Sequence, residues 1–314
     1  MGCTEFTNTN TDKVVRPVKN SRQNSKSNFN GFQNYLFEIP TKVEGVDLYE
    51  ANCGHFFVDM FSRDSTKDSD NENSLIRHKK WKRMVMSCIF ESKNEELCEL
   101  NEIEIYNALQ LYKYKFPTKF ISKVRKGPPS IYRWIAWKIC LNYSKNFRIG
   151  VYQKYLKEIP IAEYVDNIDK DIERTFPDHP LFKSEKFGIV GKKMLHNILV
   201  AYSNYNPSIG YCQGMNFITA FLLINSGLRE EEGFWVFTSI MENGYENDPL
   251  KIKGIKGLYL NFLPLLRLFN ELYKLMFKEV NNNLFEFFQK MEIHELMYVD
   301  KWVLTLFIYS IPYT

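Results

Sequence analysis

One arginine in the sequence lies where a predicted helix ends. Arg174 follows Ile168 and Asp171 at intervals of three, so these side chains lie near one face of a predicted helix. Pro177 limits how far that helix can continue, which puts Arg174 near its C-terminal end, where the side chain can project. The planar guanidinium matches phosphate oxygens. A structural role is also open, because Arg174 would favour the negative pole of the helix dipole and Asp171 would be its ordinary partner one turn away.

One glutamine lies between two helices that are predicted in the stretch 195–224. The first helix is amphipathic, a proline and a glycine then turn the chain, and the second is nearly all apolar from about residue 215 to 225. Gln213 precedes the second helix, and its amide can accept a hydrogen bond from water while it donates another. A capping or turn residue would also explain it. Tyr211, two residues earlier, is predicted to pack and to position the loop.

The elements that must position these residues are helices. From residue 127 onward strand signals are absent, and helix follows helix with short turns. Ser130 is the predicted N-cap of the first of them. The predicted fold class is therefore all-α, a multi-helix domain. Helices are expected over 96–112, 130–143, 151–155, 166–174, 230–241, 258–280, 283–291 and 298–309.

Composition divides the chain into three parts. Residues 1–31 are rich in Asn, Ser and Lys with few apolar residues, and we expect them to be disordered. Residues 32–126 are predicted to form an N-terminal helical extension with a polar loop at 63–74. Within it, 32–62 would pack as a strap, and the basic cluster 77–83 would be a helix with a charged face. Residues 127–314 form the main domain.

The overall composition excludes several classes of protein. A hydrophobic content of 45% in 314 residues is ample for a core, and a net charge of +4 is too small to indicate a nucleic-acid surface. The six cysteines are scattered without a C-x-x-C pair, which favours a reducing, cytosolic compartment. No apolar run reaches the length of a membrane span, so a soluble protein is expected.

The N-terminal sequence offers one route to a membrane. After loss of Met1, Gly2 could carry a myristoyl group beside a palmitoyl group on Cys3, and two acyl chains would anchor the chain stably. The myristoylation motif asks for Ser or Thr at position 6, where Phe6 stands. Acylation therefore stays a minor alternative to a solvated basic tail.

Several short segments resemble metal-binding or phosphate-binding motifs, but each lacks a feature that the motif requires. The glycines in 188–193 are too close for a phosphate loop, and no Ser or Thr follows the lysine. His294 and Glu295 would begin a zinc-protease motif only if residue 298 were histidine, and it is Tyr298. No Ser or Cys occupies a nucleophile elbow. The sequence therefore predicts no self-contained active site, no metal site and no cofactor of its own.

Three short sequence motifs together resemble those of a known family. Their order and spacing over 127–314 resemble the R-x-x-x-W, I-x-x-D-x-x-R and Y-x-Q motifs of the TBC domain, found in Rab GTPase-activating proteins. The segments 175–182 and 210–216 and the pair Tyr298 and Trp302 follow the same family order. The three motifs are Arg133 with Trp137, Ile168 with Asp171 and Arg174, and Tyr211 with Gln213.

The resemblance implies an activator that supplies two catalytic side chains in trans. Arg174 would insert against the γ-phosphate of GTP bound to a Rab-family GTPase, and Gln213 would orient the attacking water. Arg133 and Asp171 would help to arrange Arg174, while Trp137 would be core. GTP and Mg²⁺ would be held by the partner. The implied setting is vesicle trafficking and intracellular protein transport, in the cytoplasm or peripherally on endomembranes.

One departure from the family pattern concerns the C-terminal part. Family domains continue with further helices beyond a Tyr-x-x-x-Trp helix, whereas this sequence stops at Thr314. We therefore expect an incomplete C-terminal lobe and an exposed hydrophobic face over 302–311. The alternative to an activator is then a module that docks a Rab or a scaffold without accelerating hydrolysis.

Overall fold

The computed structural model describes residues 42–43, 46–47, 71–89, 100–183, 185–243 and 254–311. The chain divides into two units, 1–36 and 37–314, and every described residue belongs to the second. Strands β1 (Lys42–Val43) and β2 (Val46–Asp47) pair antiparallel, and the remaining regular elements are helical. The predicted all-α class is confirmed. The tail 1–31, with Gly2 and Cys3, and most of the predicted strap lie outside the described residues.

Three helices precede the main domain. They are α3 (Asn71–Ile89), α4 (Glu102–Lys115) and α5 (Pro117–Arg125). Helix α3 begins inside the predicted polar loop, and α4 begins later than the predicted helix 96–112. A capping box fixes the start of α4, because the Asn101 side chain accepts from the backbone N–H of Glu104 and the Glu104 side chain accepts from that of Asn101.

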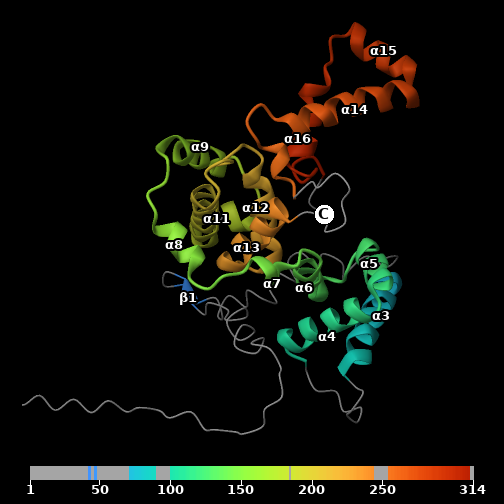
Figure 1. Cartoon of the computed structure of the whole chain (residues 1–314), viewed down its shortest axis with the longest axis vertical. Helices are drawn as coiled ribbons and strands as arrows, with labels where there is room; N and C mark the ends of the chain where they lie inside the picture. The colour runs from blue at the N-terminus through green and yellow to red at the C-terminus, as the bar shows by residue number, and fades with distance from the viewer. Residues whose placement is uncertain are drawn as a thin grey trace, which may run out of the picture. The chain divides into compact units, whose positions relative to one another are not determined.

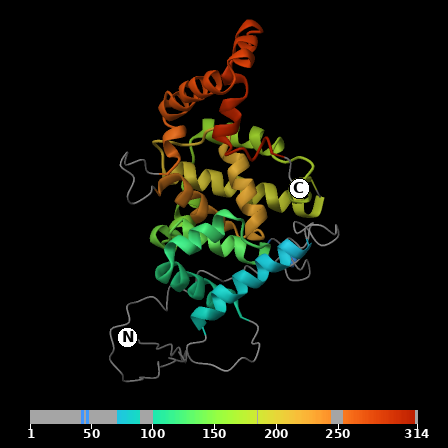
Figure 2. The same ribbon diagram turned by 90° about the vertical axis from the view of Figure 1, so that its right-hand side faces the viewer.

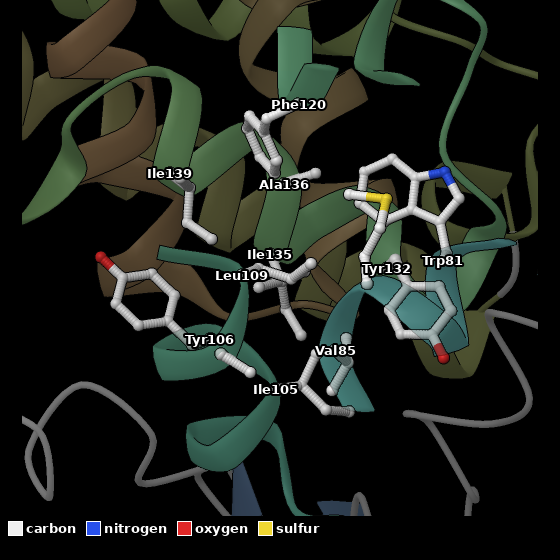
Figure 3. Close-up of a cluster of buried hydrophobic side chains, with 12 residues drawn as sticks. Trp81, Val85, Ile105, Tyr106, Leu109, Phe120, Tyr132, Ile135, Ala136 and Ile139 are labelled. Carbon is white, nitrogen blue, oxygen red and sulfur yellow. The ribbon is translucent and has the colours of Figure 1, made fainter. Parts of the chain in front are cut away.

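These three helices share a hydrophobic core with α6 (Ser130–Cys140) (Figure 2). Figure 3 shows side chains from all four helices pointing into one cluster. The ring of Trp81 stacks on Tyr132 of α6 at 5.7 Å and meets the edge of Phe120 of α5 at 6.2 Å. All three side chains are buried, so α3, α4 and α5 fold as part of the main domain.

Helix α11 (Glu185–Tyr205) is the centre of the main domain. It packs against α8 (Val151–Lys157), α9 (Ala162–Glu173), α10 (Pro180–Lys183), α12 (Met215–Ser226) and α13 (Glu230–Glu242) (Figure 1). The short α7 (Tyr143–Asn146) lies against α13. Helix α12 is buried along most of its length, as its nearly all-apolar sequence predicts.

The start and end of α6 differ from the prediction. Pro129, with φ −56° and ψ 153°, is the N-cap residue, and Ser130 is already helical. The expectation that Ser130 caps this helix is wrong, because Pro129 supplies the extended cap backbone and leaves Ser130 at the first helical position. The helix ends at Cys140, and Tyr143 begins α7 rather than ending α6.

The C-terminal helices are shorter and more broken than predicted. They are η1 (Lys256–Leu258), α14 (Pro264–Val280), α15 (Asn282–Lys290), η2 (Glu295–Met297) and α16 (Val299–Leu304). The single helix expected over 258–280 is interrupted, because Phe262 and Leu263 have positive φ and Pro264 then starts a new helix. Positive φ at Leu306 and Phe307 likewise ends α16 before residue 309.

The expected exposed hydrophobic face is present near the end of the described chain. Leu306, Phe307, Tyr309 and Ile311 are exposed, and Trp302 is half-buried against Phe307. None of the helices in the described ranges has the length and apolar character that a membrane crossing requires.

Candidate functional site

Arg174 lies at the end of α9, where the sequence placed it. The helix buries Ile168 and Ile172, four residues apart, against the domain. Arg174 is the C-cap residue, and its backbone N–H donates to the carbonyl of Asp171. Its side chain is 55% exposed, so the guanidinium is held at the surface rather than in the core.

Asp171 connects Arg174 to the loop that precedes α12. Its Oδ1 lies 2.5 Å from Arg174 Nη2, and its Oδ2 accepts a hydrogen bond of 2.6 Å from the Tyr211 hydroxyl. Burial and this hydrogen bond to Asp171 raise the pKa of Tyr211 above its usual range, so the hydroxyl stays protonated and keeps donating. The buried carboxylate is thereby paired on both oxygens, as burial of a charge requires.

A second buried chain of hydrogen bonds joins the same two loops. The carbonyl of Asp171 accepts from Thr175 Oγ1 at 2.6 Å, and Thr175 Oγ1 accepts from Asn216 Nδ2 at 2.8 Å. Asn216 Oδ1 in turn accepts from the backbone N–H of Gly214 at 3.0 Å. Thr175 and Asn216 were not predicted as site residues. The sequence feature that could have indicated Asn216 is an asparagine inside an otherwise apolar helix.

Gln213 is exposed at the turn between Tyr211 and α12. Within the described ranges no group hydrogen bonds its side-chain amide, which therefore points to solvent with its donors and acceptor available. Gly214 follows with φ 108°, and a Cβ there would lie 2.9 Å from the carbonyl oxygen of Leu304. Only glycine fits this backbone and this close approach, so the loop lies directly against α16.

Arg174 and Gln213 line one groove of about 440 Å³. The opposite wall comes from α16 and the turn after it, including Leu304 and Tyr309, next to Phe217 of α12. Figure 1 shows α16 beside α12. This wall was not predicted as part of the site. The reason is that α16 follows the two loops by some hundred residues in the sequence.

The wall carries one acidic and one basic side chain. Asp300 accepts a hydrogen bond of 2.8 Å from Asn270 of α14, and Lys301 Nζ lies 5.0 Å from the centre of the Tyr309 ring. The groove therefore has apolar sides and two cations, Lys301 and Arg174. Burial raises the pKa of the Cys212 thiol in the same groove, so this cysteine is a poor nucleophile. Among the described residues no three His, Cys, Asp or Glu gather as for a metal ion.

The two predicted residues of α6 lie outside the groove lining. Trp137 is half-buried and stacks on Phe221 of α12 at 5.8 Å, so it supports the helix that follows Gln213. Arg133 is also half-buried, and it is not a partner in the hydrogen bonds or ion pairs described for Asp171. Its role in arranging Arg174 stays a prediction.

Residues 130–314 match the Rab-GTPase-TBC domain family. The chain belongs to this family. The match begins at Ser130, the first residue of α6, although the TBC domain of this chain shares its buried core with α3, α4 and α5.

Relatives of known name agree with this assignment. The chain is 32% identical over 283 residues to the Ecotropic viral integration site 5 protein homolog of Homo sapiens, covering 89% of this chain and 30% of that protein. It is 32% identical over 198 residues to the Rab GTPase-activating protein eat-17 of Caenorhabditis elegans, covering 63% of this chain and 20% of that one. The chain thus spans 20% to 30% of the length of these relatives.

Solved structures show the same fold. The Chlamydomonas flagellar RabGAP TBC domain aligns over 78% of this chain and 73% of its own, with a TM-score of 0.51 and 22% identity. The Ypt/Rab-GAP domain of Gyp1p aligns over 76% of each chain with a TM-score of 0.50 and 18% identity. At these identities the likeness establishes the fold.

Proposed function

We propose that this chain stimulates GTP hydrolysis by a Rab-family small GTPase, with Arg174 and Gln213 acting in trans. The observation that carries the proposal is that these two side chains, from loops 39 positions apart in the sequence, line one groove and are both available to a partner. Buried hydrogen bonds through Asp171, Tyr211 and Asn216 join the two loops. The family membership and the printed names of relatives such as eat-17 support the same activity.

Arg174 suits charge stabilisation at a transferring phosphoryl group. Phosphoryl transfer depends on positioning and electrostatics rather than on covalent chemistry by the protein, and an arginine supplied in trans raises the rate by roughly 10³ to 10⁵. Asp171 holds one terminal nitrogen of Arg174 and leaves the rest of the planar fork to solvent. The exposed nitrogens of the guanidinium can therefore bind a phosphate while Nη2 stays paired with Asp171.

Gln213 suits the orientation of the attacking water. The amide can accept a hydrogen bond from the water while its NH₂ group donates to the partner, and neither bond changes its protonation. Because Asn216 bonds the N–H of Gly214 and the loop lies against Leu304, the backbone that presents Gln213 is fixed in advance. A preorganised donor and acceptor need no rearrangement when the transition state forms.

The chain needs no nucleotide or metal of its own for this mechanism. GTP and Mg²⁺ are held by the GTPase, and the activator is not itself the hydrolase. We place this activity in vesicle trafficking and intracellular protein transport, in the cytoplasm or peripherally on endomembranes.

Phosphate release from a panel of GTP-loaded Rab proteins tests the proposal. We expect catalytic amounts of the chain to accelerate release from at least one member of the panel, with retention of the GTP-bound form measured in parallel. Binding of a GTP-loaded Rab without any acceleration would instead identify a docking module, and the proposal would be wrong.

A further inference from the structure

The N-terminal helices carry a surface of cations that form no ion pair with an acidic residue of the described ranges. On α3 these are Arg77, Lys79, Lys80, Lys82 and Arg83, and on and after α5 they are Lys119, Lys123, Arg125 and Lys126. All are exposed except Lys123, which is half-exposed, and none of the nine forms an ion pair with a described residue. Some cations elsewhere are paired, as in Lys192 with Glu173 and Lys256 with Glu242. We call these nine residues the basic surface.

The nearby described carboxylates do not neutralise the basic surface. Between residues 75 and 127 they are Glu102 and Glu104. Glu102 pairs with Lys138 and Arg229, and Glu104 closes the capping box of α4. Both carboxylates are therefore engaged in other interactions. Other acidic residues at or near the ends of α3 have side chains outside the described part of the structure, and experiments on the full chain include their effect. They are Asp64, Asp68, Asp70 and Glu72 on one side and Glu91, Glu95, Glu96 and Glu99 on the other.

Two contacts bring α3 next to α5, so the cations of the two helices lie on neighbouring elements. Trp81 faces inward and contacts Phe120, which holds α3 against α5, while the lysines of α3 are exposed. At the other end of this contact, a Cβ on Gly127 would lie 3.6 Å from Arg77 Nη1. The start of α3 thus meets the end of α5, where Arg125 and Lys126 lie.

Aliphatic side chains accompany these charges. Leu75 and Ile76, in the helix that carries the lysines, are 54% and 40% exposed. Clusters of four to eight Lys or Arg are typical of anionic lipid recognition, and aliphatic neighbours can enter the boundary between headgroups and acyl chains. Single-stranded nucleic acid stacks on exposed aromatic rings; the one Trp of α3 is buried, although Phe116, beside Lys119 at the start of α5, is 42% exposed.

We propose that the basic surface binds the anionic face of a lipid bilayer through headgroup phosphates. This contact is separate from the groove, since no residue of the basic surface lines it. It would hold the chain on a membrane without an acyl group, and it does not depend on the proposed activity towards a Rab.

Co-flotation of the full, unacylated chain with vesicles tests the proposal. We expect binding to phosphatidylcholine vesicles that contain phosphatidylserine, little binding to phosphatidylcholine alone, and weakening by salt. The triple variant Lys79→Glu/Lys80→Glu/Lys82→Glu should lower the partition coefficient about a hundredfold or more, since each cation near an anionic surface contributes about 1 kcal/mol. A neutral Lys→Gln version should show a smaller loss of the same kind.

A matched control distinguishes an effect of the basic surface on vesicle binding from an effect of net charge. Lys157→Glu/Lys278→Glu/Lys290→Glu changes three exposed lysines of other helices, and both triple variants shift the net charge from +4 to −2. We expect the control to keep most of the vesicle binding, and both variants to keep the wild-type melting temperature. Equal binding by the two variants would overturn the proposal.

The N-terminal tail is a competing source of positive charge. A variant with Gln at Lys13, Arg16, Lys19, Arg22 and Lys26 should still float with anionic vesicles. Loss of flotation in the tail variant, with retention in the α3 variant, would assign binding to the tail. Tight RNA binding at physiological salt without vesicle binding would assign the basic surface to nucleic acid. Either result would contradict the proposal.

Discussion

Two clusters of charged side chains in this domain are built differently. In the groove, Asp171 is buried but its partner Arg174 is 55% exposed. In the core, Lys138 of α6 is 1% exposed and lies 3.1 Å from Glu102 and 3.2 Å from Glu232 of α13. Arg229 bonds both glutamates, and Trp134 Nε1 donates to Glu232 at 2.7 Å. The core cluster therefore joins α4, α6 and α13.

The difference shows which charges stabilise the fold and which remain available to a partner. The charged groups of the core cluster are matched inside the domain, so removal of one leaves another buried without compensation. Arg174 keeps most of its donors in solvent, so its removal should leave the fold intact. Substitution of Arg174 should therefore lower mainly the activity, whereas substitution in the core cluster should lower mainly the stability.

The largest expected effect is on hydrolysis, at Arg174. Arg174→Ala should lower the stimulated rate by roughly 10³-fold or more, as loss of an arginine finger does. Arg174→Lys should restore little, because the planar fork is lost. Phosphate release measures both. The circular dichroism spectrum should be unchanged, and the melting temperature should fall modestly because Asp171 Oδ1 loses its partner. Arg267→Ala, an exposed arginine of α14, is the matched control. Retention of most of the activity in Arg174→Ala would remove this residue from the mechanism.

The next largest effect is on stability, at Lys138. Lys138→Ala leaves Glu102 and Glu232 with too few partners and should cost about 3–5 kcal/mol in the free energy of unfolding. Urea unfolding measures this. Lys192→Ala is the control, because its ion pair with Glu173 is largely exposed and should contribute about 1 kcal/mol or less. Equal losses in the two variants would mean that the core cluster is no stronger than a surface pair.

Gln213 should affect the rate but not the binding. Gln213→Ala should slow stimulated hydrolysis about a hundredfold or more, the order of magnitude for loss of one preorganised transition-state contact, while GTP-loaded Rab still binds. A Rab whose own switch glutamine is changed to leucine should still be partly stimulated by the wild-type chain. Ser208→Ala, in the exposed turn nearby, is the control. An unchanged rate in Gln213→Ala, together with no stimulation of that Rab variant, would make Gln213 a turn residue.

Much of the site could be predicted from local patterns. Ile168, Asp171 and Arg174 lie within two turns of one helix, so their spacing alone places them, and Pro177 marks the region where the helix ends. Asp171 and Arg174 form the pair that this spacing predicts. Gln213 could be placed before a helix because α12 is nearly all apolar and Gly214 precedes it.

The rest of the site depends on contacts that no local pattern encodes. Thr175 and Asn216 are 41 residues apart, and their hydrogen bond exists only because α9 and α12 pack together. The groove wall at α16 depends on the close approach of Leu304 to Gly214. The end of α16 could not be predicted either, since leucine and phenylalanine, not glycine, adopt positive φ there.

A smaller effect should appear as a dependence of stability on pH. Burial opposes ionisation of Glu102, but Lys138 and Arg229 outweigh it and lower its pKa from 4.5 to about 2. A carboxyl with a depressed folded pKa stabilises the fold above its unfolded pKa and loses that contribution as pH falls from about 4.5 towards 2. The stability difference between the wild type and Glu102→Gln in urea should be constant above that window and shrink within it. A difference independent of pH would contradict the assignment.

The smallest effect should come from Tyr211, which connects the two loops of the groove. Tyr211→Phe keeps the buried ring but leaves Asp171 Oδ2 without its 2.6 Å donor, and loss of a hydrogen bond to a charged group costs about 1.5–3 kcal/mol. The freed oxygen can then compete for the nitrogens of Arg174, so the stimulated rate should fall several-fold with little change in Rab affinity. Tyr152→Phe is the matched control, since that buried hydroxyl also donates to a carboxylate, Glu230, away from the groove. Both variants should lose stability in urea, but only Tyr211→Phe should lose rate. If the two variants behave alike in both measurements, the Tyr211–Asp171 bond stabilises the fold and does not position Arg174.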